Sequence, residues 1–218
     1  MNESRSKTGP DGRVEPEDAG GSKAQLSRRS FLQGMGLAAG AAAIPLKFSE
    51  AVAAEAGTGI GPGAARIQLK VNGAMRTVEV EPRMTLAEVL REELDMTGTK
   101  IVCDRGACGG CTVMLDGESV CSCMMWAADA RGKEITTIEG LERADGTLDP
   151  VQEGFIEHDA QQCGFCTPGL VMASRAFLNE NPDPTLEEIK EGLAGNICRC
   201  GTYTHIFAAV QYAAKKEA

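Results

Sequence analysis

The sequence predicts an α+β protein in which a small mixed sheet is followed by a bundle of four helices. Between residues 65 and 138, short runs of alternating apolar and polar residues are separated by turn residues, which is typical of strands. From about residue 148 the apolar residues recur at the spacing of helices. Eight of the nine cysteines also fall into two sets, one in each of these regions. Each region is therefore expected to carry a site of its own.

A hairpin opens the predicted sheet. Apolar residues at 67, 69 and 71 alternate with polar ones, and Asn72-Gly73 is the pair that favours a type I′ turn. The pattern continues at Val78 and Val80 on the returning strand. Two neighbouring antiparallel strands are the expected result.

A helix and three later extended runs complete the first region. Thr85-Leu-Ala-Glu88 has the capping-box pattern, and the next apolar residues share one side of the predicted helix: Leu86, Val89, Leu90 and Leu94. Strands are expected at 112–115, after the Asp116-Gly117 turn, and at 135–138. A hairpin, a crossing helix and later strands form a β-grasp domain.

Four helices are expected in the second region. Val151, Phe155 and Ile156 mark the first, and Thr167-Pro168 supplies a cap and an N1 proline for the second. Thr185-Leu-Glu-Glu188 is another capping box and opens the third. An apolar stripe marks the fourth: Ile206, Phe207, Val210 and Ala214.

The N-terminus has the features of an export signal. Ser27-Arg28-Arg29-Ser30-Phe31-Leu32-Gln33 matches the bacterial twin-arginine pattern, and a mildly apolar run follows to Leu46. Ala51-Val52-Ala53 offers a cleavage site. The pathway carries folded proteins, so we expect a periplasmic protein that is exported already folded.

The composition divides the chain and excludes some function classes. We expect a disordered N-terminus with the signal at 1–54, a linker at 55–64, and domains at 65–140 and 141–218. The chain has 218 residues and a formal charge of −9, which argues against a nucleic-acid partner. No run of membrane-spanning length follows the signal.

The first cysteine set has the spacing of an iron–sulfur loop. Cys103, Cys108 and Cys111 follow the x4, x2 pattern of plant-type [2Fe–2S] proteins, whose architecture is the β-grasp. Glycines between them allow backbone N–H groups to face the sulfurs. The fourth ligand could be Cys121 or Cys123, because alternate residues of one strand share a face.

The second cysteine set consists of two close pairs at the turns beside helices. Cys163-x2-Cys166 precedes the second predicted helix, and Cys198-x-Cys200 precedes the fourth. Loops between the helices would bring the four thiols together around a second cluster. A chain with two such clusters is expected to carry electrons.

Three other interpretations of the cysteines compete with an iron–sulfur centre. The x4, x2 triple fits zinc poorly, and His158 and His205 lack the Cys-x-His pairing of a Rieske centre. Disulfides are the stronger rival, because exported proteins oxidise their thiols. The odd number of cysteines and their tight clustering argue against disulfides.

Several motifs resemble those of the iron–sulfur subunit of the molybdenum hydroxylases, the xanthine dehydrogenase and aldehyde oxidoreductase family. They are Gln162-Cys-Gly-Phe-Cys-Thr-Pro-Gly169, Gly195-Asn-Ile-Cys-Arg-Cys-Gly-Thr-Tyr203, the Cys103–Cys111 loop and Ile135–Gly140. The resemblance covers about residues 65 to 214, and with the signal it is nearest to the small subunits of periplasmic aldehyde oxidoreductases. It implies that Cys123 is the fourth ligand of the first cluster. Gly-Thr-Tyr after Cys200 departs from the Thr-Gly-Tyr of the eukaryotic enzymes.

The resemblance implies a partner and a direction of electron flow. A large subunit would hold molybdopterin, in the cytosine dinucleotide form, and oxidise the substrate, which is expected to be an aldehyde. Electrons would enter the cluster of Cys163, Cys166, Cys198 and Cys200, then the cluster of Cys103, Cys108, Cys111 and Cys123. They would leave to an FAD-binding subunit or a c-type cytochrome. Gln162 and Cys200 occupy the positions that approach the pterin in this family.

The chain is therefore expected to be part of an oxidoreductase and not catalytic alone. The alternative is a free-standing two-cluster carrier or redox sensor without a stable partner. Trp126 and the Met124-Met125 pair are interpreted as core residues rather than as a contact surface.

Overall fold

The computed structural model describes residues 61–143 and 145–217, and the structural statements below concern these residues. The twin-arginine motif and most of the expected linker lie outside them. Both expected domains fall within one compact unit, residues 58–218, so the boundary at residue 140 stays a prediction.

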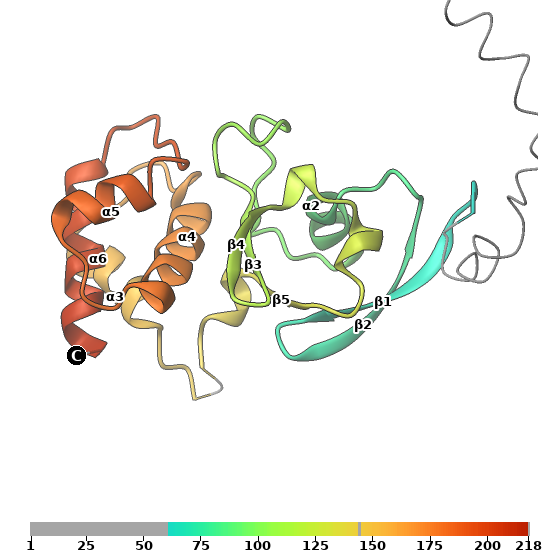
Figure 1. Ribbon diagram of the computed structural model, residues 1–218, viewed down its shortest axis with the longest axis horizontal. Coiled ribbons are helices and arrows are strands. Elements are labelled where there is room, and N and C mark those ends of the chain that lie inside the picture. The colour runs from blue at the N-terminus through green and yellow to red at the C-terminus, as the bar shows by residue number, and fades with distance from the viewer. Residues whose placement is uncertain (1–60, 144, 218) are drawn as a thin grey trace, which may run out of the picture. The chain divides into compact units, whose positions relative to one another are not determined.

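A five-stranded mixed sheet forms the first part of the structure (Figure 1). Its order is β2-β1-β5-β3-β4, with β1 and β5 parallel and the other neighbours antiparallel. The strands are β1 Ala65–Val71, β2 Ala74–Val80, β3 Thr112–Leu115, β4 Glu118–Cys121 and β5 Glu134–Thr136. The α+β class expected from the sequence is confirmed.

The hairpin between β1 and β2 has the expected turn. Val71 pairs with Ala74, and Asn72 and Gly73 have φ values of 50° and 75°, as a type I′ turn requires. The alternating residues at 67, 69 and 71 are buried, so this face of the hairpin covers the core.

The helix expected after Thr85 is shorter and wider than a regular α-helix. The capping box is present, and α2 spans Leu86–Glu88. The next turn is a π-helix, η1 (Val89–Glu93), in which the Leu94 N–H donates to the Val89 carbonyl. The wider turn keeps Val89 and Leu90 fully buried, while Leu94 is only partly buried.

Three short 3₁₀ segments connect the later parts of the sheet. They are η2 Ser122–Met124, η3 Ala127–Ala130 and η4 Ile138–Gly140. Strand β4 ends at Cys121, so the expectation that Cys121 and Cys123 share one strand is wrong. The final expected strand is also shorter, because the chain turns into η4 after β5.

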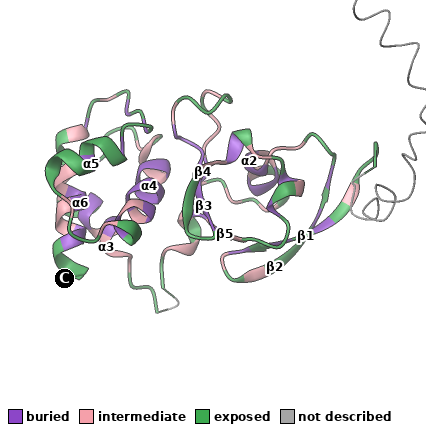
Figure 2. Cartoon of the chain, viewed as in Figure 1, coloured by how far each residue is buried: buried purple, intermediate pink, exposed green. Residues whose placement is uncertain are grey.

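Four helices form the second part, as the sequence predicts. They are α3 Pro150–Glu157, α4 Thr167–Glu180, α5 Leu186–Gly192 and α6 Tyr203–Glu217. Figure 2 shows buried residues along α4 and α6. Two details differ from the expectation: Ile156 is 61% exposed, and the N-cap of α4 is Cys166 rather than Thr167.

An ion cluster joins three of these helices. Arg175 of α4 is mostly buried and pairs with Glu217 in the last turn of α6. Its Nη1 also lies 3.6 Å from Asp149, which caps the N-terminus of α3. The pKa of Arg175 is raised: burial alone would lower it, but the hydrogen bond to Glu217 and the charge of Asp149 outweigh burial.

In the described residues, no helix combines the length and apolar character that crossing a membrane requires.

Helices α3 and α6 pack closely because α3 carries a glycine at the contact. A Cβ built on Gly154 would lie 2.5 Å from the Ala209 carbonyl oxygen. We therefore expect Gly154→Ala to lower the free energy of unfolding by about 1–3 kcal/mol through overpacking, measured by chemical denaturation.

Gly195→Ala is the matched control, because no atom lies within 4 Å of a Cβ at Gly195. Its effect should stay within about 0.5 kcal/mol. Equal losses in both variants would contradict the close α3–α6 contact.

Candidate metal centres

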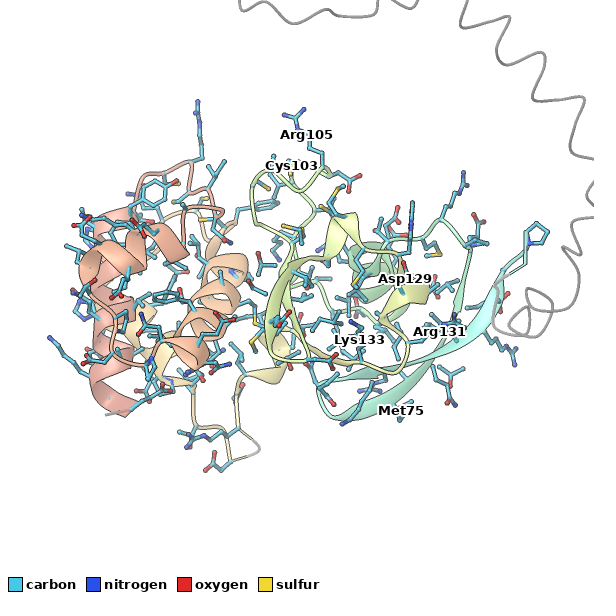
Figure 3. The ribbon with its side chains drawn as sticks, viewed as in Figure 1. Met75, Cys103, Arg105, Asp129, Arg131 and Lys133 are labelled. Atoms are coloured by element: carbon cyan, nitrogen blue, oxygen red, sulfur yellow. The ribbon has the colours of Figure 1, made fainter. Side chains whose placement is uncertain are left out.

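The first cysteine set lies on the loop that leads into β3 and on η2. Figure 3 shows Cys103 and Arg105 on this loop. Cys103 and Cys108 are partly exposed, whereas Cys111 and Cys123 are buried. The quartet therefore has an outer pair and an inner pair of thiols.

Backbone N–H groups of the loop surround the sulfur of Cys103. The Arg105 N–H is the main reason that the pKa of Cys103 falls to about 7, followed by the Cys108 thiol and the Ala107 N–H. The Ala107 nitrogen lies 3.3 Å from Cys103 Sγ. Such a loop stabilises a thiolate before any metal binds.

The inner pair is held in a less polar environment. Burial raises the pKa of Cys111, and burial together with the Cys111 thiol raises that of Cys123 to about 11. The side chains of Cys111 and Cys123 are hydrogen-bonded to each other. A metal must displace their protons, which couples metal binding to pH.

The two possible fourth ligands contact Gly106 differently. The Cys123 sulfur accepts a hydrogen bond from the Gly106 N–H, as a thiolate ligand would. The Cys121 thiol instead lies 4.0 Å from the Gly106 carbonyl oxygen, toward which only a protonated thiol can donate. Cys111 contacts both thiols. The contacts with Gly106 favour Cys123.

The second cysteine set brings two turns of the helical region together. Cys163 is exposed before α4, and Cys166 is the N-cap of α4. Cys198 is buried and Cys200 is partly buried, and both precede α6.

These four thiols also form two pairs. The Phe165 N–H and then the Cys200 thiol lower the pKa of Cys163. Burial, followed by the hydrogen bond with Cys198, raises the pKa of Cys166 to about 12. Burial would raise the pKa of Cys198 too, but the Thr202 hydroxyl and backbone N–H lower it to about 7.

The pairing fits the chemistry of a cluster with two irons. All nine cysteines are free thiols. Among the described residues, no three Cys, His, Asp or Glu side chains form the compact group that a single ion needs. In a [2Fe–2S] cluster each iron takes only two protein ligands, so two thiol pairs per quartet are the appropriate arrangement.

A buried hydroxyl beside the second quartet also fits a bound group. Thr167 Oγ1 is buried and has no hydrogen-bond partner within the described residues. It belongs to the residue after Cys166. A sulfur acceptor in the cluster would satisfy such a donor, which otherwise costs about 1–3 kcal/mol.

Hydrogen bonds connect the two cysteine loops. The Ile197 N–H donates to the Cys108 carbonyl over 2.9 Å. The buried Asn196 Nδ2 lies 3.0 Å from the Gly109 carbonyl oxygen and 3.2 Å from that of Gly169. Two neighbours of Cys198 thus hold the first loop in place.

Large apolar side chains lie exposed beside the cysteines. Val102, Phe165 and Ile197 are each about half exposed, and with Arg199 they line a cavity of about 140 Å³ that also contains thiols of both quartets. We call Val102, Phe165 and Ile197 the apolar face. Each is adjacent in sequence to a cysteine, and this adjacency is the sequence signal that could have predicted the apolar face.

The remaining candidate residues are distributed over the surface. Gln162 is exposed next to Cys163. Met124 and Trp126 are 63% and 50% exposed, so their interpretation as core residues is wrong, although Met125 packs against the core. The backbone bridge between Trp126 and Thr85 fixes the chain here and leaves the ring outside.

Comparison with known proteins matches both regions of the chain to [2Fe–2S]-binding domains. Residues 69–141 match a 2Fe-2S iron-sulfur cluster binding domain, and residues 137–211 match a second [2Fe-2S] binding domain. The nicotine 6-hydroxylase small subunit of Paenarthrobacter nicotinovorans is 49% identical over 66% of this chain and 86% of its own. The aldehyde oxidoreductase iron-sulfur-binding subunit PaoA of Escherichia coli (strain K12) is 39% identical over 93% and 92%.

A solved structure of a related enzyme has a similar fold. Quinoline 2-oxidoreductase from Pseudomonas putida 86 superimposes with a TM-score of 0.68 at 44% identity, over 71% of this chain and 95% of that chain. The fold and site thus define a protein with two [2Fe–2S]-binding domains. The chain belongs to the family of iron–sulfur small subunits of the molybdenum hydroxylases.

The contacts of Gly106 predict that Cys123, and not Cys121, is the fourth ligand of the first cluster, and substitution of each cysteine tests this. Cys123→Ala should lose about half of the bound iron and one of two EPR signals, because a [2Fe–2S] cluster needs four ligands. Cys121→Ala should keep both signals. The reverse pattern would make Cys121 the ligand.

Proposed function

We propose that this chain is the electron-transfer subunit of an exported molybdenum hydroxylase. Cys103, Cys108, Cys111 and Cys123 bind one [2Fe–2S] cluster, and Cys163, Cys166, Cys198 and Cys200 bind the other. When bound, the clusters accept and release single electrons. The observation that carries the proposal is the arrangement of eight free thiols in two quartets, one on the loop before β3 and on η2, and the other on the turns before α4 and α6.

The chain's own residues supply a short connection between the two quartets. Cys108 of the first quartet and Ile197, next to Cys198 of the second, share a backbone hydrogen bond of 2.9 Å. The buried amide of Asn196 keeps the two loops at this separation. Electrons that arrive at the helical quartet can therefore continue to the ferredoxin-like quartet.

A large molybdopterin-binding subunit is the proposed partner. The relatives are described as small or iron-sulfur-binding subunits, which supports a separate catalytic chain. The apolar face is exposed here and would be buried in such a complex. Gln162 and Cys200 lie on the loops beside it and are proposed to contact the pterin, in its cytosine dinucleotide form.

Aldehydes are the proposed substrates. The proposed acceptor of the electrons is an FAD-binding subunit or a c-type cytochrome. The similarity to the aldehyde oxidoreductase subunit covers 93% of the chain and so includes most of residues 1–60. The nicotine 6-hydroxylase relative covers 66%. This difference supports the aldehyde branch and an export signal at the N-terminus, hence a periplasmic location.

The partner proposal predicts the effect of a charge in the apolar face. The native chain should carry two [2Fe–2S] EPR signals and co-purify with a much larger chain. Ile197→Glu should lose most of this co-purified chain while keeping both signals, because a buried unpaired carboxylate weakens an interface strongly.

Ile156→Glu is the matched control, since Ile156 is also more than half exposed but lies on α3 and does not line the cavity beside the quartets. It should leave the complex intact. A native chain that purifies alone with full iron would instead support the free-standing carrier.

The export proposal predicts the result of a conservative change in the signal. Replacing Arg28 and Arg29 together by lysine should leave the protein in the cytoplasm with its iron bound, because the twin-arginine pathway requires the pair. Cell fractionation followed by iron analysis measures this. Unchanged periplasmic accumulation would remove the twin-arginine assignment but leave the cluster proposal standing.

A further inference from the structure

Thr202 occupies the N-cap position of α6 but uses its hydroxyl differently from the other threonine caps. The Thr202 carbonyl accepts the first hydrogen bonds of the helix. In α2 and α5, the hydroxyls of Thr85 and Thr185 accept from the backbone of their own helix. The Thr202 hydroxyl instead lies 3.2 Å from Cys198 Sγ.

The sequence explains the difference. Thr85 and Thr185 each have a glutamate three residues later, which completes a capping box. The corresponding residue after Thr202 is His205, whose ring Nδ1 lies 2.8 Å from the His158 carbonyl oxygen. The Thr202 hydroxyl has no such reciprocal partner and is free to contact the sulfur.

The surroundings hold this contact in one geometry. Gly201, with φ of +80°, turns the chain back after Cys200. The Cys198 N–H donates to the Tyr203 hydroxyl over 2.9 Å. Thr202 is 4% exposed and Cys198 is 6% exposed, so water does not compete for the sulfur.

The direction of the hydrogen bond follows from the state of the sulfur. An iron-bound cysteine is a thiolate and has no proton, so the Thr202 hydroxyl must be the donor. A donor stabilises the more negative charge of the reduced cluster more than that of the oxidised cluster. Hydrogen bonds to the sulfurs are among the factors that set the potentials of such clusters.

We propose that Thr202 raises the reduction potential of the helical-domain cluster by donating a hydrogen bond from its hydroxyl to Cys198 Sγ. Thr202 is thus a tuning residue that favours electron entry at this cluster. The inference rests on the proposed function, because it requires Cys198 to bind iron.

The test is an EPR-monitored redox titration of the full chain with its clusters, with dithionite as the one-electron reductant. Thr202→Val removes the hydroxyl and keeps the shape and the backbone N–H. At a fixed potential, it should increase the ratio of oxidised to reduced helical-domain cluster about tenfold. This corresponds to a reduction potential about 59 mV lower. The reduction potential of the ferredoxin-like cluster should not change. In Thr202→Ser, both potentials should stay near the wild-type values.

Thr137→Val is the control, because Thr137 is fully buried and hydrogen-bonded to Asn72, with no cysteine among its partners. It should lower stability without moving either potential. An unshifted potential in Thr202→Val, or equal shifts in Thr202→Ser and Thr202→Val, would overturn the inference.

A separate result bears on the proposed function. Wild-type protein without two [2Fe–2S] signals would refute the function, whereas two signals with an unshifted variant refute only the role of Thr202. If Thr202→Val fails to hold its cluster, Thr202→Ala takes its place as the variant without a hydroxyl. Its reduction potential is then compared with that of Thr202→Ser, which keeps the hydroxyl. Cluster loss in both, but not in Thr202→Ser, would show that the hydroxyl retains the metal rather than tunes it, which also overturns the inference.

Discussion

The contact between the two cysteine loops is the constraint on which the proposed function depends. Two electron carriers exchange electrons only when they are close, and here hydrogen bonds from a buried side chain and from one backbone N–H join the two loops. Asn196 holds the Gly109 carbonyl, and Ile197 donates to Cys108. Both residues precede Cys198, so the first loop is hydrogen-bonded to the segment that carries a ligand of the other quartet.

This proximity accounts for two glycines, and at Gly109 it adds to a left-handed backbone with φ of 66° that already favours glycine. A Cβ on Gly169 would lie 2.3 Å from the Gly109 carbonyl oxygen, and a Cβ on Gly109 would meet the Asn196 amide at 2.5 Å. Larger residues at either position would push α4 or the second loop away from the first. The glycines therefore act at the contact between loops, where side-chain volume would separate the quartets.

The sequence predicted the sheet, the four helices and the cysteine sets because these depend on local spacing. Turn pairs, capping boxes and apolar periodicity all describe neighbours along the chain, and Thr85, Thr185 and Asn72-Gly73 behave as expected. The π-turn after Glu88, the end of β4 at Cys121 and the exposure of Trp126 depend on distant packing instead. The role of Asn196 likewise depends on residues far apart in sequence, because its amide bonds Gly109. Thr202 lies only four residues from Cys198, but their contact depends on the local turn at Gly201, which sequence periodicity does not describe.

The ion cluster at Arg175 has a consequence for how the helical region opens. The guanidinium on α4 holds the cap of α3 through Asp149 and the last turn of α6 through Glu217. If the end of α6 frays, a largely dehydrated cation loses one of its two counter-charges, and the start of α3 is weakened with it. The two helix ends therefore unravel as one cooperative unit rather than independently.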